Sequence, residues 1–147
     1  MGHTIQLRAA DGKSIPAYIA EPEGKAKGSV VVIQEIFGVN SHIRNVVDGY
    51  AQDGYLAIAP AAFERVQAGV ELGYTEADMG QGFGFKTAVE ALPAPGVMQD
   101  IKPRSITSPK AGTRSASWVI AGAASSPGDR LARFKACLQP RPTMAAV

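Results

Sequence analysis

Four consecutive apolar residues, Val30 to Ile33, are followed within five positions by an acid and a glycine, Glu35 and Gly38. The apolar run is continuous rather than alternating, which is typical of a central strand that is covered on both faces of a parallel sheet. A carboxylate directly after such a strand is costly to bury unless it has a partner or lies in a cleft. We therefore expect a functional site where this strand ends.

The next residues along the chain predict a helix and then a second strand. Asn40 or Ser41 can cap a helix whose apolar positions recur every three to four residues, and Gly54 is the expected stop. These apolar positions are Ile43, Val46, Val47 and Tyr50. A short apolar strand at residues 55–59 ends at Pro60. Strand, helix and strand in this order predict a βαβ unit with a parallel core.

An antiparallel hairpin is predicted before this unit, with strands at residues 4–7 and 15–19 around the turn at Asp11-Gly12. After the unit, residues 61–80 are predicted to be an acidic loop. A helix is expected over residues 85–92, and another from Gly96 through Ile101. Phe83 and Phe85 are interpreted as core residues rather than as the lining of a substrate pocket. Further along the chain, only residues 116–124 are apolar enough for one more buried strand.

The composition limits the classes of protein to consider. A chain of 147 residues suggests one domain, and its single cysteine, Cys137, excludes an internal disulfide and is compatible with a reducing compartment. The start of the chain does not resemble a signal peptide, and no apolar run approaches the roughly 20 residues that span a bilayer. His3 and His42 are far apart and no Cys-x-x-Cys occurs, so no zinc site of ordinary spacing is expected. We expect a cytoplasmic protein that does not act at a membrane.

Charge is distributed unevenly along the chain. Residues 1–101 contain seven Lys and Arg against twelve Asp and Glu, whereas residues 102–147 contain eight against one. Such a break indicates a basic tail or a change of domain. The tail has no aromatic interleaving and no recognisable nucleic-acid module, so nucleic acid is not an expected partner. We divide the chain into an α/β domain, residues 1–101, and a basic tail of little pattern, residues 102–147.

Residues 34–40 read Gln-Glu-Ile-Phe-Gly-Val-Asn, and the pairs Ile43-Arg44, Gly54-Tyr55 and Ala59-Pro60 come after them. These motifs and their spacing closely resemble the dienelactone hydrolase family of α/β-hydrolases, over about residues 4–101. The resemblance implies the N-terminal part of an α/β-hydrolase fold, with a hairpin and parallel strands between flanking helices, incomplete in this chain. It also implies hydrolysis of a small-molecule ester or lactone by a Cys, His and Asp triad, without a metal or an organic cofactor.

The resemblance assigns roles to two residues of the motif. Glu35 occupies the position of an acid that contacts the nucleophilic cysteine in this family, where a carboxylate disfavours the thiolate until substrate displaces it. Ile36 contributes its backbone N–H as one donor of the oxyanion hole, where a fixed dipole meets the charge that develops on the attacked carbonyl oxygen. Glu35 and the Ile36 N–H are therefore the candidate catalytic groups of this chain.

The rest of the family's catalytic apparatus is not found in this sequence. The nucleophile of the family lies in a Gly-x-Cys-x-Gly elbow, which does not occur here, and no histidine follows His42 in the 147 residues. We therefore expect negligible ester turnover from this chain. The alternative is a non-catalytic α/β module that binds a ligand or forms a dimer, and the oligomeric state stays open.

A change of reading frame explains both the missing elbow and the charge break. Residues 117–124 can be reverse-translated with synonymous codons so that the frame displaced by one base reads Val-Gly-Tyr-Cys-Trp-Gly-Gly, which resembles the family's elbow. The hypothesis is that a frameshift near Ile101 or Lys102 replaced the family's own continuation. The α/β domain would then be truncated, and the tail would be out of frame.

Overall fold

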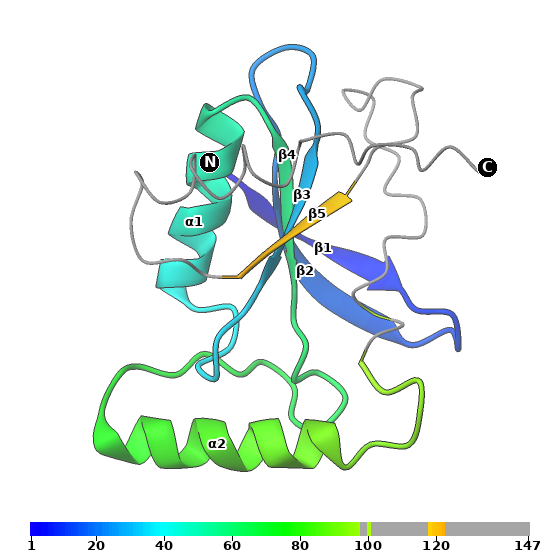
Figure 1. Cartoon of the computed structure of the whole chain (residues 1–147), viewed down its shortest axis with the longest axis vertical. Coiled ribbons are helices and arrows are strands. Elements are labelled where there is room, and N and C mark those ends of the chain that lie inside the picture. The colour runs from blue at the N-terminus through cyan, green and yellow to red at the C-terminus, as the bar shows by residue number, and fades with distance from the viewer. Residues whose placement is uncertain (98–99, 101–117, 123–147) are drawn as a thin grey trace, which may run out of the picture.

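The structure is a computed structural model that describes residues 1–97, residue 100 and the backbone of residues 118–122. One mixed sheet runs through it in the order β1-β2-β4-β3-β5 (Figure 1). Its strands are β1 (His3–Arg8), β2 (Ser14–Ala20), β3 (Ser29–Ile33), β4 (Leu56–Pro60) and β5 (Trp118–Gly122). The two helices described are α1 (Ser41–Gln52) and α2 (Glu76–Glu90).

Strand pairing confirms the predicted hairpin and the predicted βαβ unit. β1 pairs antiparallel with β2, and β2 pairs antiparallel with β4. β3 lies parallel to β4 on one side and parallel to β5 on the other, so that Ser29 is level with both Leu56 and Trp118. β5 lies within the range 116–124, where the sequence predicts one more strand. This α/β sheet brings the carboxyl ends of β3, β4 and β5 to one edge.

β3 is buried on both faces, as its continuous apolar run predicts. Val30 and Val32 belong to the apolar cluster that includes α1, whereas Val31 belongs to a second cluster with Leu56 and Ile58. All five side chains are at most 1% exposed. Because successive side chains of a strand point to opposite faces, only a run without polar interruptions can fill both clusters.

α1 packs on the sheet through the apolar residues that its sequence spacing predicts. Its buried residues are Ile43, Val46, Val47 and Tyr50. The facing residues of β4 are Ala57 and Ala59, whose small side chains let the helix approach the sheet closely. The side chain of Asn40 caps the first turn by accepting a hydrogen bond from the Ile43 N–H at 3.2 Å. Gly54 follows the last turn with φ +94°, which glycine adopts without strain.

α2 corrects the predicted acidic loop over residues 61–80 and the helix over 85–92. The helix begins at Glu76, behind an N-terminal capping box in which Thr75 and Asp78 bond each other's backbone N–H groups. Gly80, Gly82 and Gly84 lower the helix propensity of this segment, which is why its sequence resembles a loop. The prediction of Phe83 as a core residue is also wrong, because this residue is 57% exposed. Phe85 packs at a tilt against Phe63, with the ring centroids 5.7 Å apart.

Several predictions concern residues that the structure does not describe. The expected helix from Gly96 through Ile101 lies partly outside the described residues, and residues 94–97 form a turn. The boundary at residue 101, Cys137 and nearly all of the basic tail lie outside them as well. Neither α1 nor α2, nor any other helix in the described part, has the length and hydropathy needed to cross a bilayer.

Candidate functional site

The candidate site is the turn that leaves β3, residues 34–40. Backbone bridges join Gly38 to Glu35 within the turn and to Glu71 in the segment after β4. The Gly38 N–H donates to the Glu35 carbonyl at 3.4 Å, so the chain reverses direction directly after the buried strand. This reversal lies at the sheet edge where β3, β4 and β5 all end.

The segment that contains Val70 and Leu72 packs against the turn and forms hydrogen bonds with it. Gly38 has φ +80°, and a Cβ on it would overlap the Val70 carbonyl oxygen. The Leu72 N–H donates to the Phe37 carbonyl at 2.8 Å, and the Asn40 amide donates to the Leu72 carbonyl at 3.2 Å. Only glycine fits at position 38, because both the conformation and the space exclude a side chain.

Glu35 and Ile36 are both half-buried on this turn. In the part of the chain that the structure describes, the Glu35 carboxylate has no hydrogen bond or ion pair, and the Ile36 N–H donates to no acceptor. Unpaired groups of this kind can serve an incoming ligand, because a buried N–H gains most from an acceptor that carries developing charge. The structure thus brings an acid and a free N–H together in consecutive residues.

Gln34 is a further residue of the site that the sequence analysis did not single out. Its Oε1 accepts a hydrogen bond from the Ala62 N–H at 2.9 Å, which connects the end of β3 to the second residue after β4. Its Nε2 is buried and has no partner among the described residues. The sequence signals were its position after the strand and its place as the first residue of the motif at residues 34–40. Its amide is a second polar group at this sheet edge.

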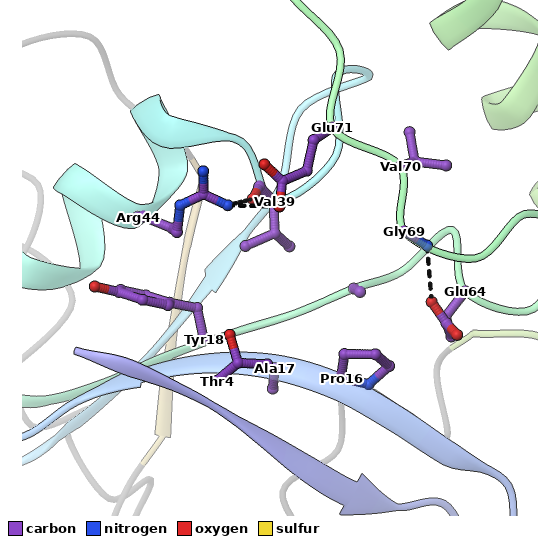
Figure 2. A pocket seen from close by; sticks show the side chains of 11 residues that line it. Thr4, Pro16, Ala17, Tyr18, Val39, Arg44, Glu64, Gly69, Val70 and Glu71 are labelled. Atoms are coloured by element: carbon purple, nitrogen blue, oxygen red, sulfur yellow. Dashed lines mark hydrogen bonds and ion pairs between the residues drawn. The ribbon is translucent and has the colours of Figure 1, made fainter.

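A small pocket of about 90 Å³ lies between the hairpin and the segment after β4 (Figure 2). Arg44 forms one wall, where its Nη1 donates to the Val39 carbonyl at 2.9 Å and to Glu71 Oε1 at 2.7 Å. The bond to Glu71 raises the pKa of Arg44 above its ordinary value. Glu35 and Ile36 do not line this pocket. The pocket therefore meets the candidate turn at Val39, away from the two candidate catalytic groups.

Tyr18 lies beside Arg44 in the same pocket (Figure 2). Its hydroxyl donates to the carboxylate of Asp48, with contacts of 3.1 and 3.2 Å to the two oxygens. Burial, and then the bond to Asp48, raise the pKa of Tyr18 above its usual value. A neutral tyrosine engaged with an acid on α1 is a packing element here, which links the hairpin to the helix.

No group of three His, Cys, Asp or Glu residues in the described part of the chain has the arrangement of a metal site. His3 lies on β1 and His42 lies in the first turn of α1.

The turn at residues 34–40 lies within the part of the chain that matches a known protein family. A family model described as "Dienelactone hydrolase family" matches residues 15–103, which include all of β2 but Ser14, together with β3, β4, both helices and the turn at residues 34–40. The chain belongs to the dienelactone hydrolase family. The resemblance that the motif at residues 34–40 indicates is thereby confirmed.

Two relatives named as carboxymethylenebutenolidases illustrate the extent of the match. The protein of Synechocystis sp. is 56% identical over 62 residues, which are 42% of this chain and 25% of the relative. The protein of Azospirillum brasilense is 44% identical over 69 residues, which are 46% of this chain and 30% of the relative. The matched part therefore spans less than a third of the length of these relatives.

The fold agrees with a solved member of the family. The crystal structure of a dienelactone hydrolase from Klebsiella pneumoniae superposes with a TM-score of 0.53 and 33% sequence identity. The superposition covers 68% of this chain and 40% of the other. The α/β sheet with its two helices thus matches part of an α/β-hydrolase domain.

Proposed function

We propose that residues 34–40 form the acid and oxyanion part of a site for hydrolysis of small esters or lactones. One observation carries the proposal. In a chain of the dienelactone hydrolase family, the Ile36 N–H has no acceptor among the described residues and lies in the turn after the carboxyl end of a buried parallel strand. Attack on an ester carbonyl moves negative charge to its oxygen, and such an N–H stabilises that charge.

Glu35 is proposed to govern the ionisation of a cysteine nucleophile supplied by another part of a complete site. A carboxylate near a thiol disfavours the thiolate and raises the thiol pKa, until a substrate moves the carboxylate away. Support comes from the half-buried position of Glu35 and from the absence of a partner for its carboxylate in the described residues.

The chain of 147 residues is proposed not to turn over esters by itself. It contains neither a Gly-x-Cys-x-Gly elbow nor a histidine after His42. An N–H donor and an acid can polarise or orient a substrate, but they do not replace a nucleophile and its base.

An esterase assay on the purified chain tests this point. We expect p-nitrophenyl acetate and a simple lactone to be hydrolysed at the background rate, both by the unmodified chain and by Glu35→Ala. Turnover well above that of Glu35→Ala would contradict the proposal.

The frameshift hypothesis stays a proposal, and the position of β5 supports it. The residues of β5 are those whose displaced frame can spell the cysteine elbow, and β5 pairs with β3 so that Gly122 is level with Ile33. A nucleophile at the end of that strand would lie at the same sheet edge as Glu35, because parallel strands end on one side. The coding DNA decides the matter, since the displaced frame must contain a cysteine codon within residues 118–124.

Restoring the displaced frame tests the catalytic roles. The restored protein should hydrolyse esters, and Glu35→Ala in it should shift the acid limb of the kcat/KM profile to lower pH, because the thiol loses a nearby negative charge. An unchanged profile would remove Glu35 from the proposed site.

A non-catalytic module that dimerises is the second candidate, and the position of β5 as the last strand of the described sheet favours it. A terminal strand has one row of unpaired backbone groups that another strand can pair with. Size-exclusion chromatography with a thermal melt tests it, since a compact dimer with a cooperative transition is expected. We also propose a cytoplasmic location, which the lone Cys137 supports.

A further inference from the structure

α2 meets the turn at residues 34–40 through a glycine. Gly82 is the one buried residue of this helix. Its neighbours Met79 and Phe83 are 40% and 57% exposed. The contact is therefore made by the helix backbone, and no side chain lies between the two main chains to absorb a change in their separation.

The group that Gly82 touches is Ile36. A Cβ on Gly82 would overlap the Ile36 carbonyl oxygen, and it would lie 3.1 Å from both the carbonyl carbon and the Cβ of Ile36. The positions of these three atoms are set by the backbone, so a change of rotamer cannot make room. An added methyl group at position 82 must displace either α2 or Ile36.

Two other glycines of the same helix serve as controls. A Cβ on Gly80 or on Gly84 would meet nothing within 4 Å. All three glycines lower the helix propensity in the same way. Close contact is thus a property of position 82 alone, and helix propensity does not explain why glycine occupies it.

The turn is fixed on its other side as well. The Leu72 N–H holds the Phe37 carbonyl, and Gly38 lies against Val70. Ile36 therefore lies between Phe37, whose carbonyl is held by the Leu72 N–H, and the backbone of α2 at Gly82. A donor held in this way needs no reorganisation when charge develops on an acceptor, which is the condition for effective oxyanion stabilisation.

We propose that Gly82 is a positioning residue for the Ile36 N–H. Its lack of a side chain lets α2 press against the carbonyl group and the Cβ of Ile36, which restricts the position of the residue that carries the N–H. The proposal rests on the role of Ile36 as an oxyanion donor stated above. The contact itself can be tested without any turnover.

The test compares Gly82→Ala with Gly80→Ala and Gly84→Ala in the full chain of 147 residues. Two quantities are measured, the melting temperature and the ¹⁵N–¹H amide shift of Ile36. Gly80→Ala and Gly84→Ala should raise the melting temperature by about 2 to 5 °C and leave the Ile36 amide in place. Gly82→Ala should lower the melting temperature and move the Ile36 amide, while amides in the middle of β3 and α1 stay unchanged.

A second measurement uses the unmodified chain, in case Gly82→Ala disturbs the whole fold. A nuclear Overhauser contact between the Gly82 Hα protons and Ile36 is expected, and its absence would overturn the proposal. A Gly82→Ala variant that behaves like the two controls would also overturn it, as would a lowered melting temperature with an unmoved Ile36 amide. Ester turnover by this chain would contradict the proposed function but would leave this result unaffected.

Discussion

The two helices contact the rest of the described structure through different kinds of surface. α1 buries four apolar residues against the sheet, and its face is continuous with the core. α2 buries only Gly82, and it lies across the end of the sheet beyond the loops that leave β3 and β4 (Figure 1). The α1 contact is made by buried side chains, whereas the contact of α2 with the turn at residues 34–40 is made by the backbone of Gly82.

This difference distinguishes α1, which stabilises the fold, from α2, which contacts the candidate site. Burial of apolar area stabilises the α1 side, in proportion to the area removed from water. The region of residues 61–90 is held by individual polar contacts, by the ring contact of Phe63 with Phe85, and by two close main-chain contacts, at Gly38 and Gly82. Such contacts fix the geometry of the site closely, and losing one is costly where it leaves a buried charge without its partner.

The largest effect is expected from Ile43→Ala. This side chain is fully buried between α1 and the sheet, and its truncation should lower the free energy of unfolding by about 4 kcal/mol. Met79→Ala on the exposed side of α2 is the matched control, expected within about 0.5 kcal/mol of the unmodified chain. Urea denaturation measures both. Equal losses would show that the two helices do not differ as described.

A somewhat smaller loss is expected when the main ion pair of the 61–90 region is broken. Arg65 bonds Asp100 through Nε at 2.6 Å and Nη2 at 2.7 Å, and it also reaches Asp11 at 2.8 Å. The Asp100 side chain is 1% exposed, so Arg65→Met should cost about 3 kcal/mol in unfolding free energy by leaving a buried charge unpaired.

The control for Arg65→Met is an exposed pair on α2. Lys86 and Glu90 are half or more exposed. Lys86→Met should therefore change the free energy of unfolding, measured by urea denaturation, by less than about 0.5 kcal/mol. If Arg65→Met lowered the free energy of unfolding no more than Lys86→Met does, the Arg65 ion pairs would not contribute to the stability of this region.

The helix caps provide the next comparison. Asn40 caps α1 and also bonds the Leu72 carbonyl, whereas Thr75 caps α2 at the surface. Asn40→Ala should cost about 1.5 kcal/mol in unfolding free energy and Thr75→Ala about 0.5 kcal/mol. Thermal melts of the two variants rank them, and the reverse order would mean that α2 depends more on its cap than α1 does.

The smallest effect is a dependence of stability on pH. Hydrogen bonds from Arg65 and from the Lys13 N–H lower the pKa of Asp11 from 3.8 to about 2. The contribution of this carboxylate is present above pH 4 and is lost as the pH falls toward 2, because the unfolded chain takes up the proton first. Denaturation midpoints of the unmodified chain should fall more steeply over this range than those of Asp11→Asn.

The strands and α1 could be predicted because their signals are local. A continuous apolar run predicts β3, and Ile43, Val46, Val47 and Tyr50 lie on one helix face because their spacing matches the helical period. The first half of α2, residues 76–84, was missed because three glycines weaken its helix propensity and the apolar residues of α2 do not form one buried face. The useful signal was the capping box of Thr75 and Asp78, which indicates a helix start even where the next residues are poor helix formers.

The candidate turn was predictable in place but not in detail. Glu35 and Gly38 could be recognised because an acid and a glycine stand directly after a buried strand. The contacts of Gln34 with Ala62, of Gly38 with Val70 and of Gly82 with Ile36 join segments 28 to 46 residues apart. No local pattern predicts such pairs, because they depend on how the segments cross.

The sequence by itself determined the α/β order, the buried strand β3, the packing face of α1 and, through one motif, the family. These follow from local periodicity and from residue identity, which do not require knowledge of the fold. Only the tertiary structure decided that a glycine in α2 lies against Ile36. The physical reason is that contact between two backbones depends on the absence of a side chain, and the sequence does not say which other segment fills the space that a glycine leaves.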